Sequence, residues 1–374
     1  MSKYIICKKC IMDSSDPEII LDEEGVCNHC KRYEIELPKR VFSGERAKID
    51  LEKIVSKIRQ DGKNNVYDCI VGVSGGVDST YVAYLTKQLG LRPLAIHFDN
   101  GWNSELAVAN IEKTLTKLGI DLYTFVINWD EFKDLQKSFL KASTPDGEIP
   151  TDHAINALLF KEATKHNIKY IISGMNFATE SMAVKSWAYG HSDWTYIKDI
   201  HSKFGAKKLK QYPHFTILSL FYYTFIKKIK VVSILNYIEY NKEEVMKKIV
   251  DELDWVYYGG KHYESVYTRF YQGYFLPKKF NIDKRRGHLS DLIKSGQLKR
   301  EEAIEEMKVN NYLGSLLTQD LQFVKKKLEL NDDEFQAILE AKPKSFRDYK
   351  NIEHYIVKLK KIVNLLRSKG YYTK

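Results

Sequence analysis

The sequence lacks the features that would place a protein in a membrane or outside the cell. It contains no uninterrupted apolar run of about 18 residues, the length that a spanning helix needs. The first residues, Met-Ser-Lys-Tyr-Ile-Ile-Cys, have no apolar core of the kind found in signal peptides. No internal repeat or low-complexity segment is present. We therefore expect a globular, cytoplasmic protein that has no membrane partner.

Two common nucleotide-binding signatures are also missing. The chain has neither a G-x-x-x-x-G-K-[ST] loop nor a G-x-G-x-x-G turn. Instead, residues 68–73 have the length and β-branched content of a buried strand, and the turn Ser74-Gly75-Gly76 follows directly. A helical pattern starts at Val77. A strand, a glycine turn and a helix together aim backbone N–H groups at an anion. The alternative is a glycine-rich turn without a ligand.

This stretch, Ser-Gly-Gly-Val-Asp-Ser, resembles the S-G-G-x-D-S signature of the PP-loop ATP pyrophosphatases. The resemblance implies that ATP is cleaved between its α- and β-phosphates and that AMP passes to a substrate oxygen. It also implies Mg²⁺ on Asp78 and Glu180, although Glu180 could instead be part of a polar loop that caps a helix. The residues expected to bind the nucleotide are Ser74, Gly75, Gly76, Val77, Asp78, Ser79, Phe98, Asp99, Gly174, Asn176 and Glu180.

Four of the five cysteines form two C-x-x-C pairs near the N-terminus, Cys7 with Cys10 and Cys27 with Cys30. This spacing predicts a structural zinc site with four sulfur ligands. Disulfides and a redox-active pair are the alternatives. We expect His29 to be a neighbour of the metal rather than a ligand. The fifth cysteine, Cys69, lies on the predicted buried strand and is expected in the core.

Strand and helix patterns alternate after the phosphate loop. Predicted strands at 93–98, 122–127 and 168–173 alternate with predicted helices at 104–118 and 152–166. This order predicts an α/β fold with a doubly wound parallel sheet and a ligand at the carboxyl ends of its strands. We predict a zinc knuckle at 1–45, a PP-loop domain at 46–200 and a mainly helical lobe at 201–374. Within that lobe, residues 218–240 are expected to form a buried helix or a packed helix pair.

Lysine and arginine exceed the acidic residues, which gives a net charge of +10 and favours an anionic partner. Lys261, Lys284, Arg285 and Arg286 stand among aromatic residues and can hold diphosphate oxygens. A solvated helix face or an RNA-contacting patch is the alternative for this group.

A sharper resemblance rests on an ordered set of motifs: the double knuckle, the phosphate loop, Phe98-Asp-Asn-Gly-Trp-Asn-Ser-Glu105, Pro150-Thr-Asp-His153, Gly260-Lys-His-Tyr-Glu-Ser265 and Asp283-Lys-Arg-Arg286. Together they are similar to the N-acetyl sugar amidotransferases of the PseA and WbpG type. That family implies conversion of an acetamido group on a nucleotide-linked (UDP) sugar into an acetamidino group during bacterial surface-sugar biosynthesis. It implies ATP as cosubstrate and ammonia from a separate HisH-like glutaminase, with a HisF-like subunit as a further partner. Asp78, Lys261, Lys284 and Arg285 are the expected catalytic residues.

The rival class is a PP-loop enzyme that modifies tRNA, of the thiolase or lysidine type. No cysteine follows Cys69 to support sulfur transfer, so nucleic acid is the less favoured substrate. A third alternative is a non-catalytic adaptor that senses ATP. A built-in glutaminase would need a nucleophilic cysteine after Met1, where the sequence has Ser2, or in a nucleophile elbow, and Cys69 precedes the phosphate loop instead. We therefore expect an external source of ammonia.

Overall fold

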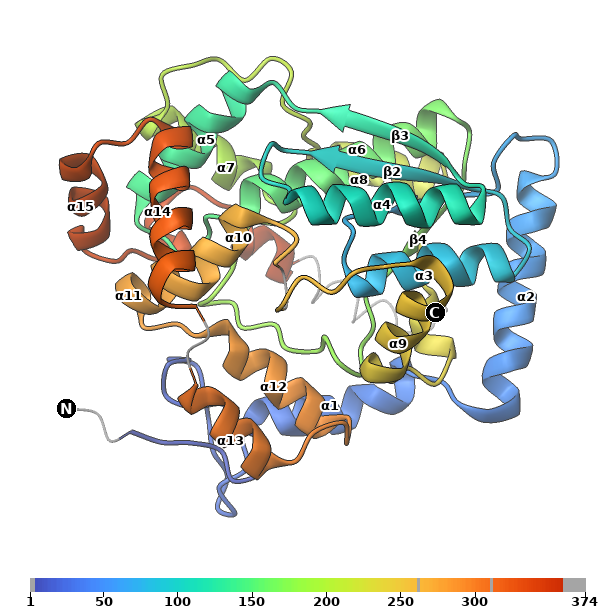
Figure 1. Ribbon diagram of the computed structural model, residues 1–374, viewed down its shortest axis with the longest axis horizontal. Coiled ribbons are helices and arrows are strands. Elements are labelled where there is room, and N and C mark those ends of the chain that lie inside the picture. Colours follow the sequence, from blue (N-terminus) through green and yellow to red (C-terminus); the bar gives the residue numbers. More distant parts are fainter. Residues whose placement is uncertain (1–3, 261–262, 310–311, 359–374) are drawn as a thin grey trace.

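The computed structural model describes residues 4–260, 263–309 and 312–358. Its centre is a sheet of five parallel strands, β1 (Cys69–Gly72), β2 (Pro93–Asp99), β3 (Asp121–Val126), β4 (Tyr170–Ser173) and β5 (Lys230–Ser233). The strand order is β3-β2-β1-β4-β5, so the chain winds outward from β1 in one direction and then in the other (Figure 1). The predicted doubly wound sheet is confirmed. The order reverses between β1 and β4, where ligands bind in such folds.

Helices cover both faces of the sheet because successive strand residues point to opposite sides. Val71 and Ile172 lie in one core with α2 (Gly44–Gly62), α3 (Val77–Gln88), α4 (Glu105–Leu118) and α9 (Lys242–Leu253). Ile70 and Ile171 lie in the other core with α5 (Trp129–Ala142), α6 (Ile149–Lys165) and α7 (Trp194–Phe204). Both faces of β1 are thus buried, which explains its continuous apolar sequence.

The C-terminal part is helical over its described residues. A nearly continuous helix runs through α10 (Val266–Phe270), a π-helical turn (Tyr271–Phe275) and α11 (Leu276–Phe280). Further along are α12 (Lys284–Lys294), α13 (Arg300–Lys308), α14 (Gly314–Leu328), α15 (Asp332–Glu340), a 3₁₀ turn (Phe346–Asp348) and helical residues 353–358. The N-terminal segment ends in α1 (Asn28–Arg40), which lies beside α12 in Figure 1. Contacts between these distant parts of the chain hold the knuckle against the C-terminal helices.

Residues 218–240 differ from the prediction of one buried helix or helix pair. They contain the end of the short helix α8 (Ile217–Phe221), a π-helical turn (Tyr222–Ile226), β5 and a 3₁₀ turn (Ile234–Tyr237). The helix ends where Lys228 adopts a φ of 57°. Val231 and Val232 then pair with Ile171 and Ile172 of β4, because β-branched residues suit a sheet better than a helix. The sheet therefore takes its fifth strand from beyond residue 200.

The other predicted helices are present with small shifts. Helix α6 begins at Ile149 rather than at Asp152, because Pro150 is accommodated in the first turn, where no N–H bond is lost. Helix α4 begins after Ser104, whose hydroxyl accepts from the Ala107 N–H. No helix in the described ranges is both long and apolar enough to cross a membrane.

Candidate nucleotide site and adjoining polar cluster

The phosphate loop, residues 74–79, connects β1 to α3 through a tight turn. Gly75 has a φ of 79°, and a Cβ there would lie 2.5 Å from the Ala107 carbonyl oxygen, so only glycine fits. The Ser79 hydroxyl donates to the Gly76 carbonyl at 3.1 Å and accepts from the Ser74 N–H at 3.2 Å. The Gly76 N–H in turn donates to the Ser74 hydroxyl at 3.3 Å. Both serines predicted to bind phosphate therefore hold the turn at the start of α3.

The segment after α9 lies on this turn. The Trp255 indole N–H donates to the Gly75 carbonyl at 2.9 Å. A Cβ on Gly76 would lie 3.4 Å from both the Tyr258 hydroxyl and a Glu264 carboxylate oxygen. Burial raises the pKa of Tyr258 and the nearby Glu264 raises it further, while the Val77 N–H that bonds its oxygen lowers it. The first N–H of α3 thus already points at an oxygen atom, as it would toward a bound phosphate.

Asp78 stands in the first turn of α3 and accepts a hydrogen bond from the Tyr240 hydroxyl. Burial raises the pKa of Tyr240, and the charges of Asp78 and Glu180 raise it further. Both carboxylates are therefore close enough to act on the same phenol. Mg²⁺ binds through one or two carboxylates together with phosphate oxygens, so Asp78 and Glu180 suit it.

The remaining predicted nucleotide residues follow β2 and β4. A Cβ on Gly174 would be 3.5 Å from the main chain of Asp78, which brings the β4 end beside the phosphate loop. Asn176 is buried, its side-chain oxygen accepts from the Thr179 N–H and hydroxyl at 2.8 Å, and its amide nitrogen has no hydrogen-bond partner among the described residues. Asp99 accepts from the Gly101 N–H at 2.8 Å. The Phe98 ring stacks on Phe125 in the core, so only its main chain faces the strand end.

Sequence reasoning missed the histidine that joins the ends of β1 and β2. His97 is buried, and its Nδ1 lies 3.0 Å from the Val73 carbonyl oxygen. Its Nε2 lies 3.1 Å from the Asn103 side-chain nitrogen. Because a carbonyl only accepts and an amide NH₂ only donates, these partners suit a ring that donates from Nδ1 and accepts at Nε2. A histidine with two such partners fixes the loop after β2 against the phosphate loop.

A second group of charged residues lies at the N-terminus of α6, and we call Glu148, Asp152, His191, Gln272 and Lys284 the polar cluster. The Lys284 Nζ lies 2.8 Å from Glu148, and the Gln272 amide donates to both Glu148 oxygens at 3.1 and 2.9 Å. His191 lies 3.3 Å from Asp152. Next to this pair, Thr151 accepts from Asn100 after β2 at 3.2 Å. The polar cluster thus belongs to the same carboxyl edge of the sheet as the phosphate loop.

Charges inside the polar cluster control its protonation. Burial lowers the pKa of Lys284, but Glu148 and other nearby carboxylates raise it by more. Burial likewise lowers the pKa of His191, and Asp152 more than restores it. Beneath them, burial raises the pKa of Asp146 to about 6, although Tyr196 donates to it at 2.6 Å. Lys284 is therefore a fixed cation, and the cluster offers both signs of charge to a polar substrate.

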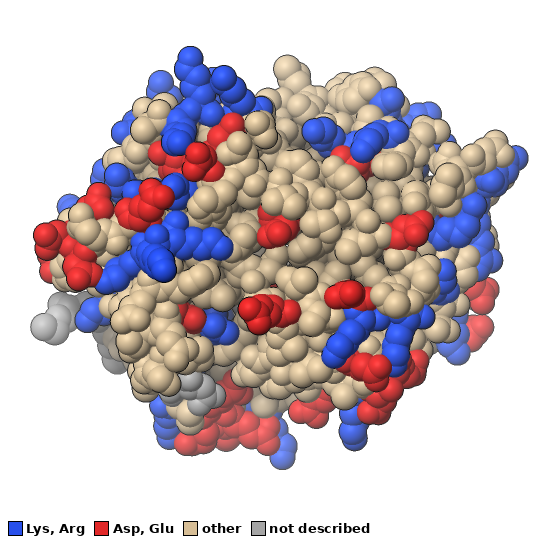
Figure 2. All heavy atoms as spheres, turned by 45° about the horizontal axis from the view of Figure 1, so that its top comes forward, with Lys and Arg blue, Asp and Glu red and all other residues tan. Residues whose placement is uncertain are grey.

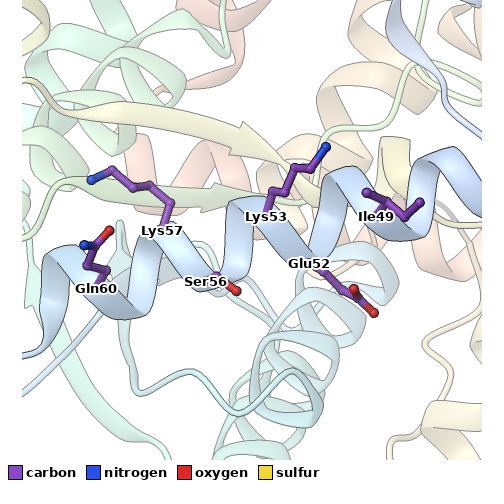
Figure 3. A pocket seen from close by; sticks show the side chains of 6 residues that line it. All are labelled: Ile49, Glu52, Lys53, Ser56, Lys57 and Gln60. Carbon is purple, nitrogen blue, oxygen red and sulfur yellow. The ribbon is translucent and has the colours of Figure 1, made fainter.

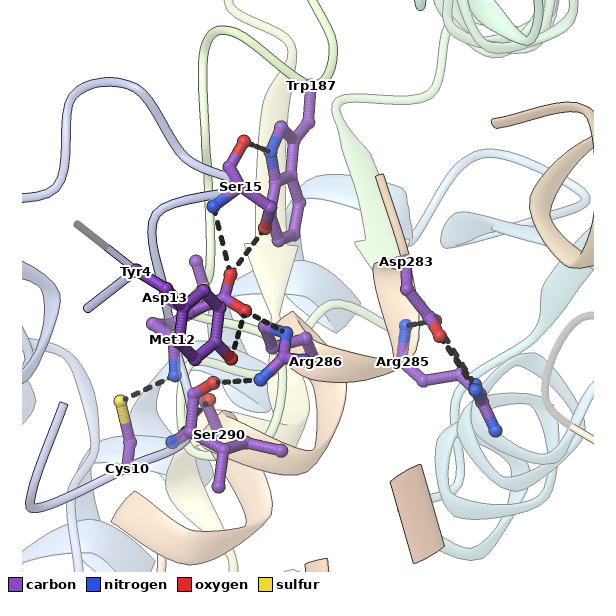
Figure 4. Close-up of polar contacts among 11 residues, drawn as sticks. Tyr4, Cys10, Met12, Asp13, Ser15, Trp187, Asp283, Arg285, Arg286 and Ser290 are labelled. Atoms are coloured by element: carbon purple, nitrogen blue, oxygen red, sulfur yellow. Dashed lines mark hydrogen bonds and ion pairs between the residues drawn. The ribbon is translucent and has the colours of Figure 1, made fainter. Parts of the chain in front are cut away.

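The three basic residues at the start of α12 point in different directions. Lys284 joins the polar cluster, while Arg285 donates to both oxygens of Asp283 and to the Val309 carbonyl, the last at 2.6 Å. Arg286 lies 3.1 Å from Asp13 and donates to the Ile11 carbonyl at 2.7 Å (Figure 4). Lys261 lies outside the described residues. Of the basic residues predicted near the substrate, the structure therefore brings Lys284 into the polar cluster, and it joins Arg286 to the knuckle.

The four cysteines predicted to bind zinc are buried and converge, with all sulfur atoms within 4.8 Å of one another. Cys7 and Cys30 are 4.0 Å apart and Cys10 and Cys27 are 3.7 Å apart. A tetrahedral zinc with bonds of about 2.3 Å needs sulfur separations of about 3.8 Å, so this set can hold the ion. His29 instead pairs with Asp16 at 2.7 Å, which agrees with its predicted place as a neighbour.

Contacts with the C-terminal helices surround this cysteine site. Arg300 donates to the carbonyls of Cys7 and Cys10 at 3.0 Å each. Ser290 of α12 accepts from the Ile11 N–H at 3.3 Å. Cys69 is fully buried in the sheet as predicted, and burial raises the pKa of its thiol.

Helix α14 also reaches the carboxyl edge. The Lys327 ammonium lies 4.9 Å from the ring centres of Trp102 and Trp129 and donates to the Gly101 carbonyl. These contacts fix the loop after β2 from the C-terminal side.

An open depression elsewhere on the surface does not coincide with these residues. Figure 3 shows it along the exposed face of α2, lined by Ile49, Glu52, Lys53, Ser56, Lys57 and Gln60. These side chains all come from one helix face, and none follows the carboxyl end of a strand. The candidate site therefore lies at the phosphate loop, where Tyr258 and Glu264 cover the glycine turn.

Two protein-family models match separate parts of the chain. Residues 68–215 match the family of queuosine biosynthesis protein QueC, and residues 264–363 match the C-terminal domain of the LPS biosynthesis protein WbpG-like family. The first range contains the phosphate loop, and the second contains Glu264 and Lys284. Together the two matches support assignment to the WbpG-type PP-loop proteins, each over part of the chain. This result confirms the resemblance inferred from the motifs.

Several characterised proteins share parts of the chain. A glutamine-hydrolysing GMP synthase of Pyrobaculum aerophilum is 33% identical over 155 residues, which are 39% of this chain and 29% of that protein. The tRNA-specific 2-thiouridylase MnmA of Proteus mirabilis is 27% identical over 204 residues, 51% of this chain and 50% of that protein. The chain thus spans half or less of the length of these relatives.

Solved structures with a similar arrangement include an NMN synthetase from Francisella tularensis, with a TM-score of 0.30 and 16% identity. The matched region covers 62% of this chain and 93% of the NMN synthetase chain. An NH3-dependent NAD synthetase from Campylobacter jejuni has a TM-score of 0.29 and 16% identity, with 56% and 85% covered.

Proposed function

We propose that the protein is an ATP-dependent amidotransferase that converts an acetamido group of a nucleotide-linked N-acetyl sugar into an acetamidino group. The observation that supports this most is the joint construction of one site by the two matched regions. The PP-loop region supplies the glycine turn, and the WbpG-like region places Glu264 on that turn and Lys284 in the polar cluster.

The proposed chemistry follows from the low reactivity of an amide. An amide carbonyl is a weak electrophile and its oxygen is a poor leaving group. Attack of the amide oxygen on the α-phosphorus of ATP releases pyrophosphate and forms an O-adenylated imidate. Ammonia then adds to the imidate carbon, AMP departs, and an amidine remains. The protein must orient oxygen against phosphorus and neutralise the departing phosphates.

The residues divide these tasks between the two parts of the site. The phosphate loop would bind the phosphates through its N–H groups and the Ser74 and Ser79 hydroxyls. Mg²⁺ on Asp78 and Glu180 would offset charge on pyrophosphate. Lys284 would hold the sugar diphosphate or the developing charge, since its pKa is raised and it stays protonated. Lys261 and Arg285 are proposed for the same anionic groups, Arg285 with its guanidinium already oriented by Asp283.

The source of ammonia in this proposal is a separate glutaminase subunit of the HisH type, with a HisF-like subunit as a further partner. Support comes from the matched GMP synthase, whose name includes glutamine hydrolysis, although this chain spans only 29% of that protein. The cysteine site would hold zinc for structure alone, because its four sulfur ligands complete a tetrahedral shell.

A tRNA-modifying activity is the second candidate, favoured by the MnmA similarity over 204 residues. Against it, no cysteine follows Cys69 in the sequence. In the view of Figure 2, Lys and Arg gather mainly toward the margins, and the central area is uncharged apart from separate acidic groups. That face therefore lacks the broad basic surface that binds a nucleic acid backbone.

Mass spectrometry of a UDP-diacetamido sugar incubated with the protein, ATP, Mg²⁺ and an ammonium salt tests the proposal. Replacement of O by NH should lower the sugar mass by about one unit, with AMP and pyrophosphate as coproducts. Formation of ADP and orthophosphate would contradict adenylation. Unmodified tRNA in place of the sugar provides the competing arm, since modified nucleosides with no amidine would favour the second candidate.

A further inference from the structure

Helix α8 and the π-helical turn after it expose an unusual number of large apolar side chains. We call these residues the α8 surface: Ile217, Leu218, Phe221, Tyr222, Phe225 and Ile226. Leu218 is 81% exposed and Ile226 is 62% exposed. Contiguous exposed apolar groups of this size mark interaction sites in proteins that otherwise bury such residues.

The α8 surface belongs to an ordered element rather than to a loose loop. Thr216 caps α8 by accepting from the Ser219 N–H at 3.1 Å. On the inner side, Tyr223 stacks on Phe160 of α6 with ring centres 5.3 Å apart, and Leu220 packs against the same core. Figure 1 shows α8 on the α6 side of the sheet. The element thus has a buried side and an apolar outer side.

The charged residues next to the α8 surface in the sequence are all basic. No Asp or Glu occurs between Asp199 and Glu239. Six exposed lysines border the element in sequence, Lys207, Lys208 and Lys210 before it and Lys227, Lys228 and Lys230 after it. Lys207 pairs with Asp130 at 3.2 Å, whereas Lys227, Lys228 and Lys230 have no ion-pair partner among the described residues. Cations without counter-charges beside an apolar face call for an anionic partner.

We propose that the α8 surface binds the headgroup region of a membrane that contains anionic phospholipid. Leucine, phenylalanine and isoleucine on one side with lysine at the border is the composition of helices that lie in the membrane interface. Protein interfaces are depleted in lysine, which makes a protein partner the poorer fit. A second copy would set lysine against lysine with no acidic residue from 200–238 to compensate.

The expectation of no membrane partner depended on the lack of a spanning segment, and interfacial binding needs none. Phe221 and Phe225 would insert between headgroups, and Lys227 and Lys228 would contact lipid phosphates. The proposal does not depend on the enzymatic reaction.

Co-sedimentation of the full chain with lipid vesicles tests it. The wild type should bind phosphatidylcholine vesicles that contain phosphatidylglycerol, bind pure phosphatidylcholine vesicles much less, and lose affinity as salt is raised. The double variant Leu218→Ser/Phe221→Ser should weaken binding by about tenfold or more, because its apolar contact is removed. Lys227→Gln/Lys228→Gln should remove most of the preference for the anionic lipid.

Val66→Ser is the matched control, because Val66 is 74% exposed in the loop before β1 and should leave binding unchanged. Circular dichroism melting checks that each variant is folded. Equal binding of all variants, or equal binding to both vesicle types, would overturn the proposal. So would light scattering that shows a wild-type dimer and a Leu218→Ser/Phe221→Ser monomer, since the α8 surface would then be a subunit contact.

Discussion

Six consecutive residues form the phosphate loop, whereas the polar cluster takes its side chains from four separate segments of the chain. In the loop, adjacent glycines and serines determine the required conformation, for example Gly75 with its φ of 79°. In the polar cluster, Glu148 and Lys284 are paired although 136 residues separate them. A local site can therefore be recognised from its motif, but an assembled one needs the fold.

The two parts also differ in what holds them. Backbone geometry and two serine hydroxyls fix the loop. The polar cluster depends on the position of α12, which packs against the knuckle. Asp291 of α12 also accepts from the Ser181 hydroxyl at 2.6 Å and from the Met182 N–H at 2.8 Å, and these bonds help to fix the helix. Changes to loop side chains such as Asp78 should thus affect mainly the chemistry, whereas changes at α12 should separate binding from stability.

Asp78→Ala should have the largest effect on the reaction. Its carboxylate, in the first turn of α3, is proposed to hold Mg²⁺ together with Glu180, so its loss leaves the ion one carboxylate short. We expect formation of AMP and pyrophosphate to fall by about 10²–10³-fold while thermal unfolding changes little. Pyrophosphate release at saturating ATP provides the measurement. Undiminished turnover would remove Asp78 from the site.

Cys10→Ser should release metal and destabilise the knuckle. Three sulfur ligands and a hydroxyl hold zinc poorly, and the Cys10 carbonyl also receives Arg300 from α13. We expect less zinc per chain by elemental analysis and a lower melting temperature. Cys69→Ala is the control, because Cys69 is in the sheet core and its loss should destabilise the fold without a change in zinc content. Zinc that stays at one per chain in Cys10→Ser would contradict the assignment.

The first four strands and the turn of the phosphate loop could be predicted from the sequence because their signals are local. Apolar, β-branched runs predicted the first four strands, and the motif at 74–79 predicted the phosphate loop. Tyr240 was missed, and Glu264 appeared only as a member of the motif at 260–265. No local sequence pattern indicates that these side chains contact Asp78 and the Gly76 turn. The fifth strand was missed because Val231 and Val232 follow a helical apolar pattern, and only pairing with β4 makes them a strand.

Gly75→Ala tests whether the loop is fixed by its backbone. A Cβ at this position would meet the Ala107 carbonyl oxygen at 2.5 Å, and φ is positive. We expect a loss of about 1–3 kcal/mol in the free energy of unfolding together with weaker ATP binding. Gly314→Ala is matched, because Gly314 has a φ of 64° and no atom within 4 Å of the added Cβ. It should cost about 1 kcal/mol from backbone strain alone and leave ATP binding intact.

Lys284→Gln and Arg286→Gln should show whether α12 contributes to the reaction through Lys284 and to stability through Arg286. Gln272 still donates to Glu148 when Lys284 is replaced, so the fold should persist while amidine formation slows by about tenfold. Arg286→Gln leaves the buried Asp13 without its cation and should lower the melting temperature by several degrees. Parallel kinetics and melting curves measure both. Equal effects of the two variants on both readouts would mean that Lys284 is structural.

His153 gives the smallest effect and tests whether a histidine in a predicted motif is structural. Its ring stacks on Phe215, its Nδ1 lies 3.0 Å from the His191 carbonyl, and burial lowers its pKa to about 4. The unfolded chain, with a pKa of about 6.5 at this histidine, binds the proton more readily below neutrality. Stability from the neutral ring is therefore complete above pH 6.5 and is lost as the pH falls toward 4. We expect about 1 kcal/mol of this loss between pH 7 and pH 5.5, and a His153 C2 proton signal in NMR that does not move over that range. Exposed histidines should shift in the same spectra, and a His153 signal that moves with them would make the ring available for proton transfer.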